Sequence, residues 1–362
     1  MGLGGSSMKI ADMHCDTISK IWESRQAGSP QQLFQNDLHV DIQKMQKAGY
    51  LLQNFAMYID LEKGLDPFTY VTELIDLFYD ELELNKDHIR MATSYNEILE
   101  NEKHGRISAI MTIEEGGCCK GELQNLETLY QRGARMMTLT WNYPNELASP
   151  NLPADGVVPV SGPDSAQGRI ESVSESIEGM AGSAKRLNQR EYDNTRGLTK
   201  KGYAFIERME ELGMIIDVSH LSDAGFWEIA KHTKKPFAAS HSNARALCPH
   251  ARNLTDDMIR VIADRGGVVG LNYYGRFLNA ADDSPSSVAR MAEHVRHIVN
   301  VGGVECIGLG SDFDGICGAM EIQNCAQMHK LAAELERRHF TGSEIENVFY
   351  KNVMRFYRQM LS

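Results

Sequence analysis

The sequence predicts an α/β fold, a (β/α)8 TIM barrel with a long insertion between its fourth and fifth strands. Two observations carry this prediction: short apolar runs recur along the chain, and amphipathic helical patterns lie between them. The runs are apolar nearly throughout, as expected of parallel strands that are buried on both faces. Strands that alternate with helices in this way are typical of a barrel with an outer layer of helices.

Eight runs are expected to form the barrel strands, in the order Lys9–Met13, Leu52–Ile59, Ile107–Ile113, Ala134–Thr140, Met214–Ser219, Pro236–Ser240, Gly267–Asn272 and Val304–Gly310. Between them, apolar residues at helical spacing predict helices over 71–82, 203–212 and 288–299. Thr199 is the expected N-cap of the second of these helices. The last helix is expected to begin with a capping box formed by Ser343 and Glu346.

One connection is much longer than the others. Residues 145–198, between the fourth and fifth runs, are rich in Gly, Ser, Pro, Asn and charged residues. We interpret them as an insertion or active-site lid within a single domain of residues 8–362, with a partly disordered surface loop as the alternative. Residues 1–7 are interpreted as the remnant of an expression tag, although their Met-Gly start also fits a myristoylation pattern.

Composition excludes several classes of partner. Lys and Arg number 37 against 49 Asp and Glu, so the net charge is −12, and no basic stripe is present for nucleic acid or an anionic membrane. No apolar run approaches the roughly 18 residues of a transmembrane helix, and no signal peptide is recognisable. The seven cysteines are scattered without a C-x-x-C pair, which favours a reducing, cytoplasmic location over a disulfide scaffold. A homodimer is left open.

Potential metal ligands follow five of the eight runs. In such barrels the catalytic residues gather at the carboxyl ends of the strands. The candidates at these ends are His14 and Asp16, Glu114 and Glu115, His220, His241, and Asp312 and Asp314. Each has an ordinary alternative, such as a hydrogen-bonded structural histidine or a solvated turn with surface acids. Because five strand ends coincide, we predict a site for zinc or another divalent transition metal.

With these motifs the chain resembles the membrane dipeptidase (renal dipeptidase) family of zinc peptidases, within the metal-dependent amidohydrolase-like barrels. The resemblance runs from about Met8 to the C-terminus. It is carried by His14-Cys15-Asp16, Glu115-Gly116-Gly117, Asp217-Val218-Ser219-His220, Ser240-His241-Ser242, Arg252-Asn253 followed by Asp256-Asp257, and Asp312-Phe313-Asp314-Gly315.

The resemblance implies two zinc ions per chain. The ligands that it implies are His14 and Asp16 on one ion and His220 and His241 on the other. Glu115, directly before the two glycines, would bridge the ions, and Glu114 falls outside the family pattern.

The resemblance also implies residues that bind the substrate. Arg252 matches an arginine that holds the substrate carboxylate, a task that suits its planar, bidentate donor. Tyr274 matches a tyrosine that lines the site, and Asp312 matches an acid beside the metals. Trp141 stands where the family has a histidine that contacts the substrate carbonyl, and its indole can donate a hydrogen bond but cannot carry a proton. A surface salt bridge for Arg252 and a packing role for Tyr274 remain alternatives.

The expected activity is therefore metal-assisted hydrolysis of a dipeptide with a free C-terminal carboxylate. Glu115 and Asp312 would be the catalytic residues, and Asp312 would take a proton from water and pass it to the leaving amine. One alternative is a related barrel amidohydrolase that acts on another amide or a lactam. The other alternative is a catalytically inactive protein that binds metal.

Overall fold

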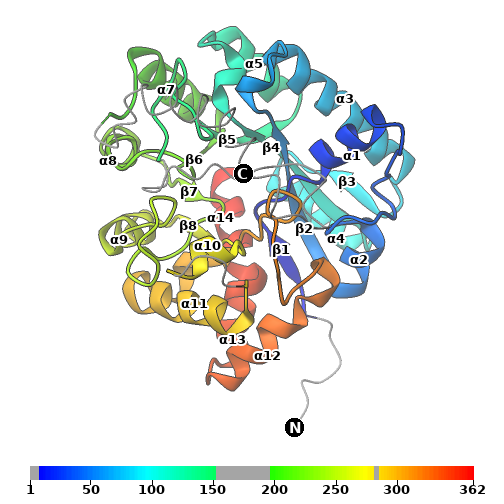
Figure 1. The fold of residues 1–362 in the computed structure, drawn as a ribbon, viewed down its shortest axis with the longest axis vertical. Coiled ribbons are helices and arrows are strands. Elements are labelled where there is room, and N and C mark those ends of the chain that lie inside the picture. Colours follow the sequence, from blue (N-terminus) through cyan, green and yellow to red (C-terminus); the bar gives the residue numbers. More distant parts are fainter. Residues whose placement is uncertain (1–7, 152–195, 281–284) are drawn as a thin grey trace, which may run out of the picture.

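Parallel strands close into a barrel, and helices form a layer around it (Figure 1). The computed structural model describes residues 8–151, 196–280 and 285–362. The barrel strands are β1 Ile10–Asp12, β2 Tyr50–Tyr58, β4 Ile107–Glu114, β5 Ala134–Thr138, β6 Ile215–Asp217, β7 Ala238–Ala239, β8 Val268–Leu271 and β9 Ile307–Leu309. Each pairs in parallel with its neighbours, and pairing of β2 with β4 closes the ring.

The helices cover the outside of the barrel and one of its ends. They are α1 Thr17–Gln26, α2 Ile42–Ala48, α3 Pro67–Leu84, α4 Tyr95–Lys103, α5 Leu123–Gln131, α7 Lys200–Leu212, α8 Asp223–His232, α9 Asp256–Asp264, α10 Gly275–Leu278, α11 Val288–Gly302, α12 His329–Arg337, α13 Gly342–Glu346 and α14 Asn352–Met360. A π-helical turn, Asn347–Lys351, joins α13 to α14.

The predicted barrel is confirmed, because each of the eight apolar runs contains one of its strands. Two details differ from the prediction. A further strand, β3 (Ile89–Met91), pairs with residues 107–109 of β4, and β5 pairs with β4 only from Met111 onward. With three residues, of which Arg90 is exposed, β3 is too short to show a strand pattern in the sequence. The eighth run begins with a 3-10 turn, Val304–Cys306, before β9.

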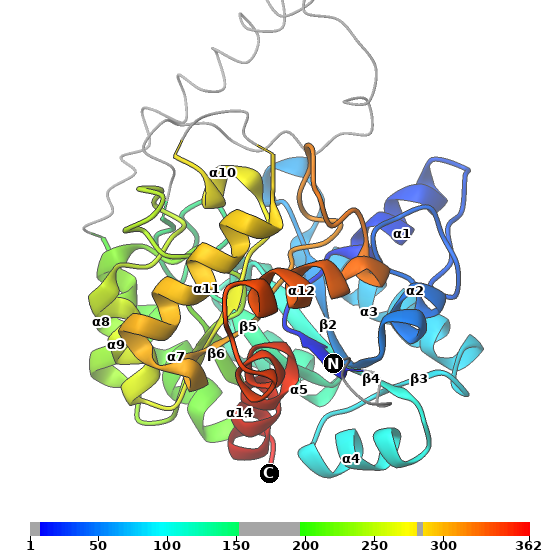
Figure 2. The ribbon, with the colours of Figure 1, turned by 90° about the horizontal axis from the view of Figure 1, so that it is seen from below.

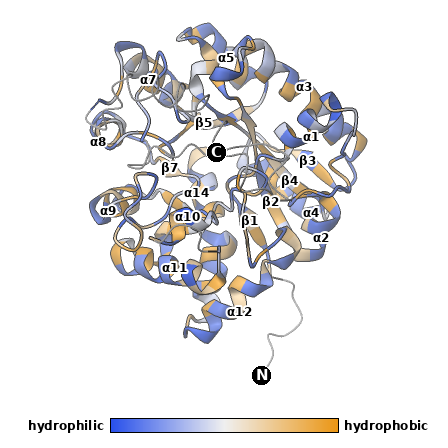
Figure 3. Cartoon of the chain, in the orientation of Figure 1, coloured by the Kyte–Doolittle hydropathy of each residue, from blue (hydrophilic) through white to orange (hydrophobic). Residues whose placement is uncertain are grey.

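The apolar core occupies both faces of the barrel wall. Outside it, Phe55 of β2 packs against Phe78 of α3, with ring centroids 5.2 Å apart. Helix α14 lies at the end of the barrel opposite α10, as Figure 2 shows, and the Tyr357 hydroxyl donates a 2.8 Å hydrogen bond to Asn54 Oδ1. Surface helices carry alternating polar and apolar stripes (Figure 3). The amino end of the barrel is therefore closed by α14, which leaves the carboxyl ends of the strands for a site.

Helix caps show where sequence spacing succeeds and fails. The Thr199 side chain accepts a hydrogen bond from Gly202 N, which confirms the predicted N-cap of α7. The capping box of α13 consists of Thr341 and Glu344, so the prediction of Ser343 and Glu346 is wrong. Both pairs have the same spacing, but the helix begins two residues earlier than predicted and Ser343 lies inside its first turn.

We expect Thr341→Ala to lower the free energy of unfolding by about 1 kcal/mol, because the substitution removes the side-chain acceptor for the N–H of Glu344. Ser343→Ala is the matched control, since Ser343 is exposed and its substitution leaves the cap in place. Urea unfolding of both variants measures the difference. Equal destabilisation by the two variants would contradict the observed cap.

Two parts of the predicted organisation lie outside the described residues: the interpreted tag remnant, 1–7, and most of the insertion, 152–195. The two described flanks of the insertion meet at an antiparallel bridge between Ala148 and Leu198. Of the helices in the described part of the chain, none has both the length and the apolar character needed to cross a bilayer.

Candidate metal centre and substrate pocket

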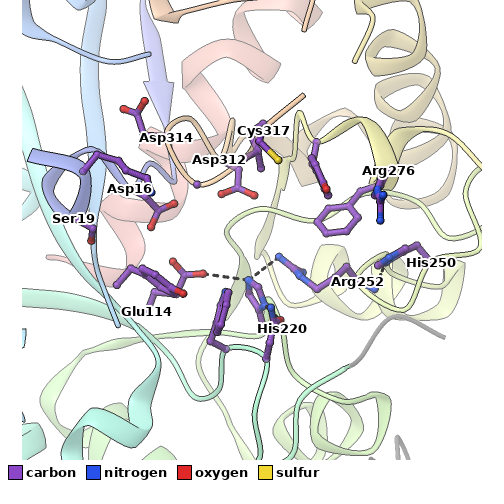
Figure 4. A pocket seen from close by; sticks show the side chains of 18 of the residues that line it. Asp16, Ser19, Glu114, His220, His250, Arg252, Arg276, Asp312, Asp314 and Cys317 are labelled. Atoms are coloured by element: carbon purple, nitrogen blue, oxygen red, sulfur yellow. Dashed lines mark hydrogen bonds and ion pairs between the residues drawn. The ribbon is translucent and has the colours of Figure 1, made fainter. Parts of the chain in front are cut away.

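Five strand ends bring acidic and histidine side chains together at the carboxyl end of the barrel. These residues are His14 and Asp16 after β1, Glu114 at the end of β4, His220 after β6, His241 after β7, and Asp312 after β9. All are buried. Figure 4 shows Asp16, Glu114, His220 and Asp312 around one pocket. Their potential ligand atoms form two overlapping groups that share His14.

Glu114 lies between the two halves of this cluster. Its Oε2 is 3.3 Å from His14 Nε2, on the side of Asp16. Its Oε1 is 3.2 Å from His220 Nε2 and 3.7 Å from His241 Nε2. One carboxylate thus presents an oxygen to each half of the cluster, which is the arrangement that a bridging ligand requires.

The structure places Glu115 elsewhere, which corrects the sequence-based assignment. Oε1 of Glu115 accepts hydrogen bonds from Gly117 N, at 2.7 Å, and from the Asn145 side-chain amide. Oε2 accepts one from Trp141 N at 2.8 Å. Both oxygens are therefore occupied by protein donors, and no contact of Glu115 with the histidines is found among the described residues. Glu114 takes the position between the histidines that the resemblance had given to Glu115.

The alternation of β4 explains this difference. Successive strand residues point to opposite faces, so Ile110, Thr112 and Glu114 share one face. Ile110 belongs to the apolar cluster inside the barrel, whereas Ile113 packs in the outer core. Glu115 follows the strand with a φ of 95°, in the left-handed region, and its side chain turns back onto the adjoining loop. The strand register, rather than the position before two glycines, could have identified Glu114.

The two histidines of the second half are oriented to present unprotonated nitrogens. His220 Nδ1 lies 3.0 Å from Asn142 Oδ1, an acceptor, so this nitrogen carries the proton. His241 Nδ1 lies 2.6 Å from Ser240 Oγ, which itself donates to Asp217. Both Nε2 atoms therefore face the site with lone pairs, 3.0 Å apart. Burial lowers the pKa of both rings well below the usual value and keeps them neutral. Two such nitrogens at this distance suit a shared cationic neighbour.

The carboxylates of the cluster also lack compensating charge. Burial, together with Asp16, raises the pKa of Glu114 to about 8. Burial raises the pKa of Asp312 to about 7. His14 Nε2 and Asp16 Oδ1 are buried and have no hydrogen-bond partner among the described residues. Three buried carboxylates, three imidazoles and these orphaned atoms form a donor set that fits divalent transition metals.

The loop after β9 approaches the carboxylates closely. Asp312 Oδ2 accepts a 2.8 Å hydrogen bond from the Asn272 amide, and Oδ1 lies 3.7 Å from His14 Nε2. A Cβ on Gly315 would meet Asp16 Oδ2 at 2.2 Å, so a side chain at this position would displace the acid. Asp312 and His220 both have φ above 60°, which is costly for residues other than glycine and is common at functional sites.

A pocket of about 930 Å³, including its open mouth, leads to the cluster. Arg252 lies in it and is only 2% exposed, which excludes the alternative of a surface salt bridge. Its Nη2 is 3.0 Å from His220 Nε2 and donates to His241 O, while its Nε has no partner among the described atoms. Burial lowers the pKa of Arg252 to about 10. The pocket thus holds a buried cationic donor beside the histidines.

Aromatic side chains form the pocket walls. Tyr274 lines the pocket and packs edge-on against Phe277, with ring centroids 4.9 Å apart. Trp141 lines it as well, 5.0 Å from the Tyr58 ring and 6.4 Å from that of His220. The sequence analysis missed Tyr58, although it ends β2 in a position that alternation places on the inner face with Asn54.

Comparison with known proteins identifies relatives of the chain. An uncharacterized protein from the pqqA 5' region of Klebsiella pneumoniae is 30% identical over 290 residues, or 78% of this chain and 95% of that protein. The dipeptidase aclJ of Aspergillus oryzae is 27% identical over 326 residues, or 87% of this chain and 68% of that protein.

A solved structure shares the fold. It is a metallopeptidase from Rhodobacter sphaeroides with a bound phosphinate mimic of the dipeptide L-Ala-D-Ala, and it superposes with a TM-score of 0.81 at 19% identity. The match covers 98% of this chain and all of that one (100%). The sequence also matches the membrane dipeptidase family model, peptidase family M19, over residues 5–161 and 174–361. This chain therefore belongs to the membrane dipeptidase family of metallopeptidases.

Proposed function

We propose that the protein hydrolyses dipeptides with a free C-terminal carboxylate at a binuclear zinc centre. The single observation that carries the proposal is the position of Glu114, whose two carboxylate oxygens face different histidine groups within 3.3 Å of His14 and 3.2 Å of His220. A carboxylate between two ligand groups supports two ions rather than one. Membership of a metallopeptidase family supports the same conclusion.

The residues divide naturally between two ions. His14 and Asp16 would hold one, His220 and His241 would hold the other, and Glu114 would bridge them. When bound, zinc would supply the Lewis acidity that polarises the scissile carbonyl and lowers the pKa of the attacking water. The Asn142 and Ser240 contacts to the outer ring nitrogens fix the orientation of His220 and His241 in advance.

Asp312 is placed to move the proton. It lies at the rim of the cluster, lines the pocket, and is held by Asn272 through one oxygen only. We propose that its other oxygen accepts the proton of the attacking water and delivers it to the leaving amine. Trp141 lines the pocket but cannot take part in this transfer, because an indole N–H is only a donor.

Arg252 supports a requirement for a C-terminal carboxylate. Its buried guanidinium stands next to His220, and its unpartnered Nε is a donor that a bidentate anion could satisfy. A carboxylate bound here would place the adjoining peptide carbonyl near the histidines. The anchor therefore limits substrates to those that end one residue beyond the scissile bond.

A panel of L-L, L-D and D-D dipeptides, with N-acylated and C-amidated controls, tests this function. Zinc-loaded protein is expected to cleave at least one free dipeptide and to leave its C-amide largely intact. L-Ala-D-Ala belongs in the panel, because the structural relative binds a mimic of it. Hydrolysis of unrelated amides or lactams without cleavage of any dipeptide would favour the amidohydrolase alternative. Bound metal without turnover of any of these compounds would favour an inactive protein.

We expect Arg252→Ala to lower kcat/KM for the best free dipeptide by about 10²-fold, since hydrogen bonds to charged groups contribute about 1.5–3 kcal/mol each. For the matching C-amidated dipeptide the loss is expected to be much smaller. Steady-state kinetics on both substrates and both proteins measures the difference. Equal losses on the acid and the amide would contradict the role of Arg252 as the carboxylate anchor.

A further inference from the structure

We propose that Arg276 forms a second anion subsite in the pocket and gives the enzyme a preference for dipeptides whose C-terminal residue is aspartate or glutamate. This inference rests on the proposed function, and it adds a substrate class that the carboxylate anchor alone does not specify.

Arg276 and Arg252 share one side of the pocket. Arg276 lies in the first turn of α10 and lines the pocket together with its neighbours Tyr274 and Phe277. The guanidinium carbon of Arg252 is 5.2 Å from the centre of the Phe277 ring. Figure 4 shows both arginines across the pocket from Asp16 and Ser19. The two cations are thus grouped around the same aromatic wall.

Their surroundings give the two arginines different tasks. Arg252 is buried beside His220, at the depth where the scissile bond must lie. Arg276 is only partly buried and lies nearer the mouth of the pocket. A dipeptide whose α-carboxylate reaches Arg252 carries its C-terminal side chain on the next atom. That side chain can extend along Phe277 toward Arg276.

Arg276 has no acidic partner within the part of the chain that the structure describes, and no hydrogen bond of its guanidinium is found there. Lys20, a cation on the opposite side of the same pocket, is paired with Glu23 at 3.0 Å. In a chain with a net charge of −12, an arginine in a pocket without an acidic neighbour is unusual. Its planar donor fits a carboxylate better than an amide of the same shape.

Pairs of substrates that differ only in this charge provide the test. The substrates are L-Ala-Asp with L-Ala-Asn and L-Ala-Glu with L-Ala-Gln, in the C-terminal configuration that the enzyme cleaves faster in L-Ala-Ala. The zinc-loaded proteins are the unsubstituted chain, Arg276→Gln, Arg276→Lys and Lys20→Gln. The last is the matched control, because it removes one positive charge from the opposite side of the pocket.

The unsubstituted chain is expected to favour each acid over its amide by about tenfold in kcat/KM. Arg276→Gln should bring this ratio close to one, and Arg276→Lys should restore part of it. Lys20→Gln should retain the preference. An acid-to-amide ratio of one or less in the unsubstituted chain would overturn the inference. So would a preference that survives Arg276→Gln, or one that Lys20→Gln reduces equally, because a general electrostatic attraction would then explain it.

Failure of the inference and failure of the proposed function give different results. If L-Ala-L-Ala or L-Ala-D-Ala is cleaved without an acid preference, the dipeptidase proposal stands and only the role of Arg276 is overturned. If no dipeptide is cleaved, the proposed function fails, and the role of Arg276 fails with it.

Discussion

Glu114→Gln is expected to lower kcat/KM for dipeptides by about 10³-fold or more. The substitution removes the charge of the carboxylate that faces both histidine groups, and metal ions contribute several kcal/mol to the stabilisation of such transition states. The metal content of the purified variant should fall below that of the unsubstituted chain. Metal analysis and dipeptide kinetics on the same preparation measure both effects.

Glu115→Gln is the control, because it changes the neighbouring residue in the same chemical way. Glu115 accepts hydrogen bonds from Gly117 N, Trp141 N and the Asn145 amide, so its substitution should cost about 1–3 kcal/mol of stability. The metal content should remain. Loss of metal from Glu115→Gln and its retention in Glu114→Gln would restore the assignment that the sequence pattern suggested.

Asp312→Asn is expected to lower kcat by about 10²–10⁴-fold while most of the metal stays bound. The amide keeps the shape of the side chain but cannot accept the proton from water. Asp314→Asn is a matched control, because Asp314 lies in the same loop and accepts hydrogen bonds from Thr17 Oγ1 and His39 N. Its loss should affect stability more than kcat. Single-turnover kinetics would contradict the account if Asp312→Asn reacted at nearly the original rate.

The barrel could be predicted from the sequence because parallel strands are buried on both faces. Even β7, which is only Ala238–Ala239, lies inside an apolar run that the sequence shows clearly. Short strands with an exposed residue leave no such signal, and β3 was missed for this reason. Caps depend on the residue at which the helix begins, which spacing alone does not fix, as Thr341 shows.

The candidate site could be predicted to the level of the strand ends but not always to the residue. His14, His220 and His241 meet as expected, because each follows a barrel strand on the same rim. The choice between Glu114 and Glu115 depended on one residue of strand register, which a motif does not encode. The contacts of Asn142 and Asn272 depend on loops that only the folded chain brings together.

The most direct test of the central claim is anomalous diffraction at the zinc edge from crystals of the zinc-loaded protein. The account predicts two anomalous peaks in each chain. One should lie beside His14 and Asp16, the other beside His220 and His241, with Glu114 contacting both. A single peak, or two peaks bridged by Glu115, would contradict it.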